Sequence, residues 1–293
     1  METSHIVFIH GLNNKPRPEE LRRIWLDALG APHNGARGFD LGAAGVHATF
    51  VYWADLFYHE PLPDGDYELV FESKAAEVAA SLGAEIPASS DAWSRTIAQK
   101  FDVVLEEEDP PTDPDDDPYE LIPLPRSVKN LFMKKMVKEA HSYLFNVEGI
   151  KDVIRARVVR ALTDQDYDNT VIVGHSQGSF IAYDVLTTAT CPEVQGFMTI
   201  GSPLGVDEIQ QELSWSRENG FPSKLQGDWV NIYDSYDPVS RLDPKLSNDF
   251  RKHGDKIVKD IREQNWGKWR HSATKYLKGP KLRQELRRLS KRP

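Results

Sequence analysis

Residues 170–180, TVIVGHSQGSF, join a run of β-branched residues to a serine with a glycine two positions before it and another two positions after it. Residues 171–173 are typical of a buried strand, and the apolar residues after the serine recur at helical spacing. A sharp strand-to-helix turn holds a serine hydroxyl away from the backbone, where it can act as a nucleophile. The pattern predicts an α/β fold and makes Ser176 a candidate nucleophile, against the alternative of an ordinary glycine-rich turn.

Strands and helices alternate on both sides of this turn. Short apolar runs that end near glycine or proline predict strands at residues 5–10, 46–53, 170–173, 194–200 and 229–233. Apolar residues spaced by three or four predict helices at residues 21–29, 179–188, 255–264 and 272–278. Such alternation is typical of a parallel sheet covered by helices. We therefore expect one α/β domain over residues 1–293, with a mostly parallel central sheet flanked by helices.

A long segment, residues 55–168, separates the second predicted strand from the strand before Ser176. Residues 106–118 within it are rich in aspartate and proline, which favour neither a helix nor a sheet, and they predict an exposed loop. Residues 128–144 place apolar side chains at helical spacing, with the lysines largely off that stripe. We expect a large helical insertion whose amphipathic helix either packs into the core or covers a site as a lid.

The turn at Ser176, with the sequence GHSQG, resembles the nucleophile elbow of the α/β-hydrolase superfamily. Three further places resemble this family: His10-Gly11 after the first predicted strand, GSP at residues 201–203, and YDSYDPV at residues 233–239. Their details are most similar to lipase and esterase branches, including those similar to GPI inositol-deacylases. The resemblance covers the N-terminal strand and most of residues 170–275, but not the insertion. It implies an α/β-hydrolase fold and a serine hydrolase activity.

The resemblance also implies an acid after the nucleophile in the chain. Asp237 is the favoured candidate, because it follows the strand at residues 229–233 and precedes a Pro-Val turn that can aim its carboxylate at the sheet edge. Asp234 is its close rival, since a small change in where the strand ends would exchange the two. Asp207 is a more distant alternative, because some lipases place their acid after the preceding strand.

A histidine should follow the acid as general base, and two histidines lie after Ser176. His271 is favoured because the chain between Asp237 and His271 is long enough for a crossover helix before the loop returns. His253 lies in a charged stretch typical of a surface turn. The proposed triad is therefore Ser176, Asp237 and His271, with His253 as the alternative base.

An acyl-transfer reaction also needs donors for the negative charge that develops on the carbonyl oxygen. The backbone N–H of Gln177, the residue after the nucleophile, is one candidate. The N–H of Leu12, in the loop after the first strand, is the other. His10 and Gly11 would shape that loop, although His10 can equally be a buried structural histidine.

Several site types have no signature in the sequence. Cys191 is the single cysteine, the histidines and acids lack a metal-binding spacing, and no phosphate-binding glycine loop is present, so we expect no cofactor and no metal. No apolar run reaches the length of a membrane-spanning helix, and the first is too short for a signal peptide, which predicts a cytoplasmic protein.

The net charge of −9 is unevenly distributed, since residues 251–293 hold 15 Lys and Arg against 4 Asp and Glu. This basic C-terminus either forms a solvated helix face or makes weak contact with an anionic membrane surface, and its last residues, 287–293, are expected to fray. We expect no nucleic-acid partner. No sequence pattern indicates an oligomeric state.

Together these features predict cleavage of a carboxylic ester, with a small-molecule or lipid-like acyl ester as substrate. Amide and thioester bonds would use the same triad. Two other classes stay open: a non-catalytic receptor or scaffold with the α/β-hydrolase fold, and a binding module that uses the basic C-terminus on a membrane surface.

Overall fold

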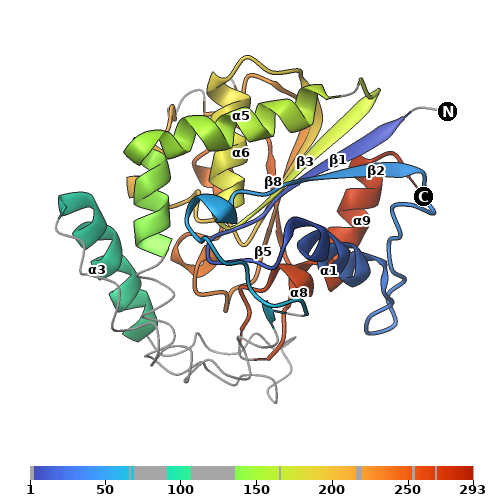
Figure 1. Ribbon diagram of the computed structural model, residues 1–293, viewed down its shortest axis with the longest axis horizontal. Helices are drawn as coiled ribbons and strands as arrows, with labels where there is room; N and C mark the ends of the chain where they lie inside the picture. The colour runs from blue at the N-terminus through green and yellow to red at the C-terminus, as the bar shows by residue number, and fades with distance from the viewer. Residues whose placement is uncertain are drawn as a thin grey trace.

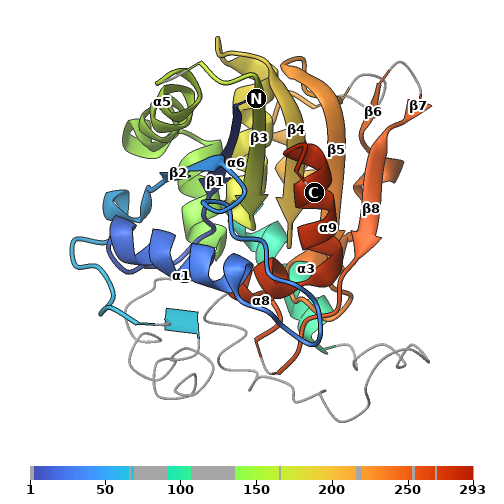
Figure 2. The same cartoon turned by 90° about the vertical axis from the view of Figure 1, so that its right-hand side faces the viewer.

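A parallel sheet of six strands forms the centre of the computed structural model, which describes residues 3–65, 67–68, 91–106, 136–164, 166–215, 220–252, 255–267 and 269–292. The strand order is β2-β1-β3-β4-β5-β8, and all neighbouring strands are parallel. Figure 1 shows the sheet between its helices, and Figure 2 shows the order of the strands. The strands are β1 (Ser4–Ile9), β2 (Val46–Val51), β3 (Asn169–His175), β4 (Val194–Ile200), β5 (Leu225–Tyr233) and β8 (Val258–Arg262). The predicted α/β architecture with a parallel central sheet is confirmed.

Helices connect these strands, and α1 begins at a proline and ends at a glycine, as expected from the sequence. Helix α1, for example, starts with Pro18, whose fixed φ suits the first turn of a helix, and carries its apolar residues at spacings of three and four. The helices are α1 (Pro18–Gly30), α3 (Ala92–Glu106), α5 (Ile150–Thr163), α6 (Gln177–Thr188), α7 (Asp207–Gln211), α8 (Ala273–Lys278) and α9 (Pro280–Leu289). The described residues also form four short 3-10 helices: η1 (Ala54–Leu56), η2 (Val147–Gly149), η3 (Ser240–Leu242) and η4 (Leu246–Asn248).

Both faces of the sheet are covered, as Figure 2 shows. Ile6 and Phe8 of β1 belong to one apolar cluster with α1, α8 and α9, whereas Val7 and Ile9 belong to a second cluster with α5 and α6. A strand that is buried on both faces of the sheet has consecutive apolar residues, and the sequences of β1 and β3 both contain such a run.

The prediction of a helix at residues 255–264 is wrong. These residues contain β8 and the short strand β7 (Asp255–Lys256), which pairs with β6 (Arg251–Lys252). β8 lies at the sheet edge, with Val258 buried and Lys259 exposed, and its backbone pairs with β5. The charged residues favour a helix locally, but pairing with an open sheet edge overrides so weak a preference. Within the described residues, the connection from β5 to β8 holds η3 and η4 in place of the expected crossover helix.

The expectation that residues 287–293 fray is also wrong for the described part. Helix α9 continues to Leu289 and packs against the sheet with Leu282, Leu286 and Leu289. The guanidinium of Arg283 is buried and donates to the carbonyl oxygens of Leu277, Ala28 and Ala31, at the C-terminal ends of α8 and α1. One basic residue of the C-terminus therefore caps two helices inside the fold, where the partial negative charge of the helix ends favours it.

The described parts of segment 55–168 are mostly helical: α3, residues 136–144 and α5. Met136, Ala140, Tyr143 and Leu144 are buried in the apolar cluster that contains α5 and α6. This half of the predicted amphipathic helix is thus core. Residues 107–118 of the predicted acidic loop and residues 128–135 of the helix lie outside the described residues. No helix in the described ranges has the length and apolarity needed to cross a lipid bilayer.

Candidate active site

The candidate site lies where the carboxyl ends of the parallel strands meet. The loop with His10 follows β1, Ser176 follows β3, Asp237 lies on the loop after β5, and His271 lies on the loop after β8. Loops at this edge of an open parallel sheet converge, although their residues are far apart in sequence. The topology therefore brings together the residues that the sequence singled out.

Ser176 occupies a sharp turn between β3 and α6. Its φ of 53° and ψ of −125° are unusual for a residue with a side chain and indicate local backbone strain. The flanking glycines permit the turn, because a Cβ on Gly174 would lie 2.5 Å from the carbonyl oxygen of Gly178, and one on Gly178 would lie 2.3 Å from that of Ile9. Within the described residues, the buried Ser176 Oγ has no hydrogen-bond partner.

His271 and Asp237 form a buried pair. His271 Nδ1 lies 2.8 Å from each carboxylate oxygen of Asp237, and the two residues are 2% and 0% exposed. This contact assigns the imidazole proton to Nδ1, which leaves the lone pair on Nε2. An imidazole held in this tautomer can take a proton from a hydroxyl through Nε2.

The histidine ring lies beside the serine turn. Its centroid is 4.7 Å from that of the His175 ring, and a Cβ on Gly201 would lie 3.1 Å from His271 Nδ1. Gly201 directly follows Ile200, whose carbonyl accepts a hydrogen bond of 2.9 Å from the Ser176 N–H. Ser176 is 1% exposed, so the side chains of all three residues are buried, but Ser176 Oγ and His271 Nε2 form no hydrogen bond with each other in the described structure.

Asp237 is ionised by its surroundings. Besides His271, its carboxylate accepts hydrogen bonds from Tyr276 Oη at 2.8 Å and from the Val239 N–H at 2.8 Å. Burial acts to raise the pKa of Asp237, but His271 and these hydrogen bonds outweigh burial and leave the pKa below its usual value. The carboxylate can therefore stabilise a positive charge on His271.

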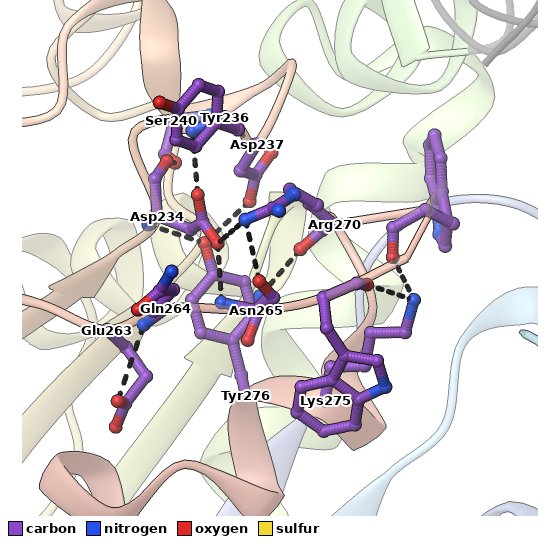
Figure 3. A network of polar contacts seen from close by, with 12 residues as sticks. Asp234, Tyr236, Asp237, Ser240, Glu263, Gln264, Asn265, Arg270, Lys275 and Tyr276 are labelled. Carbon is purple, nitrogen blue, oxygen red and sulfur yellow. Dashed lines mark hydrogen bonds and ion pairs between the residues drawn. The ribbon is translucent and has the colours of Figure 1, made fainter. Parts of the chain in front are cut away.

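Asp234, the alternative acid, faces a different set of partners (Figure 3). Its carboxylate accepts hydrogen bonds from the backbone N–H groups of Asn265 at 2.6 Å and Tyr236 at 2.7 Å, and it lies 3.4 Å from Arg270 Nη1. Burial raises the pKa of Asp234 to about 6, although Arg270 opposes the shift. Asp234 thus ties together the loops on which Asp237 and His271 lie, and Asp237 is the carboxylate that contacts the imidazole.

The predicted oxyanion loop after β1 is held by its own histidine. Trp53 N–H donates to His10 Nε2 at 3.0 Å, so the proton lies on Nδ1, which donates to the Gly11 carbonyl at 2.7 Å. Burial, together with Lys15, holds the pKa of His10 well below its usual value, so the ring is neutral. Because a peptide's N–H points opposite its C=O, the bond to Gly11 fixes the direction of the Leu12 N–H. His10 thus has a structural role that shapes the loop.

Two charged residues that the sequence reasoning missed also hold this loop. Lys15 Nζ donates to the carbonyl oxygens of Leu12 and Asn13, the latter at 2.9 Å. The carboxylate of Glu139, which is 2% exposed, accepts from the Asn13 N–H at 3.0 Å. The peptide between Leu12 and Asn13 is therefore held through both its C=O and its N–H. Lys15 follows the His-Gly signature by only four residues, but nothing in the sequence pairs Glu139 with it.

Asp207 and Cys191 take no part in this arrangement. Asp207 is exposed as the first residue of α7, and His253 lies outside the described residues. Cys191 is a buried free thiol. In the part of the chain that the structure describes, no group of histidine, cysteine and acidic residues could hold a metal ion.

Comparison with protein-family models and with curated proteins finds no match to this chain. What the protein does must therefore be inferred from the geometry of Ser176, His271 and Asp237.

Proposed function

We propose that the protein is a serine hydrolase of the α/β-hydrolase type that cleaves a carboxylic ester. The observation that carries the proposal is the strained turn at Ser176 beside a buried His271–Asp237 pair. The strand-turn-helix context of Ser176 and the chain order of serine, acid and histidine both support it.

In the proposed reaction, His271 Nε2 takes the proton of the Ser176 hydroxyl as the oxygen attacks the acyl carbonyl. The carboxylate of Asp237 keeps the imidazole in the required tautomer and stabilises its charged form. His271 then gives the proton to the leaving alcohol, which leaves an acyl group on Ser176. Water, activated by His271 in the same way, attacks this acyl-enzyme and releases the acid.

The backbone N–H groups of Leu12 and Gln177 are the proposed oxyanion donors. The side chains of His10, Lys15 and Glu139 fix the loop that carries the Leu12 N–H before substrate arrives. Preorganised donors are effective because they need no reorientation during the reaction, and removing one such donor costs about 3–4 kcal/mol of transition-state stabilisation in enzymes of this kind.

A small or lipid-like acyl ester is the proposed substrate. The alternative of a membrane-binding module gains no support from α9, because Arg283 caps two helices and Arg288 Nη1 pairs with Asp228. A non-catalytic scaffold would have no need for a strained serine beside a correctly ordered histidine and acid.

Steady-state hydrolysis of p-nitrophenyl butyrate tests the proposal. We expect turnover by the wild-type protein and a loss of at least about 1,000-fold in kcat for Ser176→Ala, since the residual rate would come from binding and the oxyanion donors alone. Ser223→Ala, a substitution at an exposed serine, is the matched control and should leave the rate unchanged. Equal turnover by Ser176→Ala and the wild type would exclude the proposed nucleophile.

A further inference from the structure

The carboxylate of Glu68 lies buried at the N-terminus of α8, directly after the loop that carries His271. Glu68 Oε2 accepts hydrogen bonds from Ser272 Oγ at 2.6 Å, from Thr274 Oγ1 at 2.6 Å and from the Thr274 N–H at 3.0 Å. Glu68 Oε1 accepts from the Ala273 N–H at 2.9 Å. All three residues that follow His271 therefore donate to one side chain.

An ionised carboxylate suits this position better than any neutral group. The first backbone N–H groups of α8 have no partners within the helix and carry partial positive charge. Glu68 offers only acceptors to these four donors and to Tyr67 Oη at 3.3 Å, whereas the hydroxyl of Ser272, the N-cap, accepts from a different N–H, that of Lys275, at 3.2 Å. The start of α8 is thus built around a side chain that comes from more than 200 residues earlier in the chain.

The residues before His271 are anchored as well. Arg270 Nη1 donates to the Asn265 carbonyl at 2.6 Å, and the Asn265 side chain donates to the Arg270 carbonyl at 2.6 Å (Figure 3). Lys275 Nζ donates to the carbonyl oxygens of Trp266 and Trp269. This half of the loop is held by its own residues and by Asp234, whereas the half after His271 depends on Glu68.

We propose that Glu68 is a positioning residue for His271, and that the segment 55–168 contributes it to the active site. This inference rests on the proposed function, in which His271 is the base. Because Nδ1 lies 2.8 Å from both carboxylate oxygens of Asp237, a shift of the loop would change the direction in which Nε2 points. Misplacement by about 1 Å can lower the rate of a catalysed step by about 100-fold.

Glu68→Gln is the informative substitution because it preserves shape. If the amide oxygen takes the Oε2 position, the amide NH₂ faces the Ala273 N–H. In the reverse orientation the NH₂ group takes the Oε2 position and faces the three donors there, which include the Thr274 N–H. Either way two donors meet, so the loop must shift. We expect kcat for p-nitrophenyl butyrate to fall by about 10- to 100-fold with KM nearly unchanged. The matched control is Glu60→Gln, an exposed carboxylate of the same segment.

A second variant, Thr274→Val, removes one hydroxyl donor to Glu68 and keeps the carboxylate, so it remains informative if Glu68→Gln does not fold. It should give a smaller loss of kcat in the same direction. The ¹H resonance of the His271 Nδ1–H, identified by its absence in His271→Gln, supplies a readout that needs no turnover. We expect it to shift or broaden in Glu68→Gln and to stay in place in Glu60→Gln.

A role confined to stability would lower the melting temperature of Glu68→Gln while leaving kcat at 20 °C and the Nδ1–H resonance as in the wild type, and this result would overturn the inference. If the wild-type protein hydrolyses no ester but the resonance still responds to Glu68→Gln, the proposed function fails and the positioning of His271 by Glu68 stands.

Discussion

Replacing Asp237 by asparagine should disable the imidazole as a base while keeping the fold. Asp237 Oδ1 accepts from the Val239 N–H at 2.8 Å, so the amide oxygen of the variant must take this position. The amide NH₂ then occupies the Oδ2 position, 2.8 Å from His271 Nδ1. The NH₂ group at this distance disfavours a proton on Nδ1 and favours its transfer to Nε2, even though the amide oxygen at the Oδ1 position also lies 2.8 Å from Nδ1. The lone pair that Ser176 needs is then lost.

The expected effect is a loss of about 10⁴-fold in kcat, equivalent to about 5 kcal/mol in the activation free energy. Asp234→Asn is the matched comparison, because Asp234 is equally buried but contacts no imidazole in the described structure. It should lower the melting temperature and cost less than about 10-fold in kcat, since only the loop packing changes. Steady-state kinetics and thermal melts of both variants check this. An equal loss of kcat in both, or near-normal kcat in Asp237→Asn, would refute the assignment of Asp237.

Three further outcomes are expected. Deleting residues 279–292 should abolish the cooperative thermal transition seen by circular dichroism, because it removes three core leucines worth about 2–5 kcal/mol each. Burial keeps the pKa of His10 and His175 well below 6.5, so these side chains take up protons below this pH only in the unfolded chain. The free energy of unfolding measured with urea should therefore decrease as the pH falls below 6.5, and His175→Asn should reduce the slope of this decrease by about 1.4 kcal/mol per pH unit. Gly11→Ala should abolish ester hydrolysis, since its Cβ would lie 2.6 Å from Ser176 Cβ.

The sequence allowed the sheet and the serine turn to be predicted because both depend on local patterns. β1, β3 and β4 are short apolar runs that end near glycine or at the serine turn, and each was expected within two residues of its observed bounds. The order of the strands also brings Ser176, Asp237 and His271 to one edge, as a parallel sheet requires. The choice of Asp237 over Asp234 rested on the turn that follows it. In the structure Asp237 is the carboxylate that contacts His271, and its role as the catalytic acid stays a prediction.

What the sequence could not reveal are contacts between distant segments. β8 carries charged residues that favour a helix locally, and only its pairing with β5 makes it a strand. The sequence of α9 is typical of a charged tail, but three of its basic residues, Lys281, Arg283 and Arg287, donate to backbone carbonyls of other segments, and no periodicity predicts such contacts. Glu68 and Glu139 lie in a segment without a recognisable motif, and their roles follow from hydrogen bonds across the fold.

The most direct test of the central claim is the reaction of the protein with a fluorophosphonate probe, which forms a covalent bond only with an activated serine. We predict one adduct per chain, located on Ser176 by peptide mass spectrometry, with labelling lost in Ser176→Ala and strongly slowed in His271→Ala. Labelling that persists in Ser176→Ala, or an adduct on another residue, would contradict the assignment of Ser176 as the nucleophile.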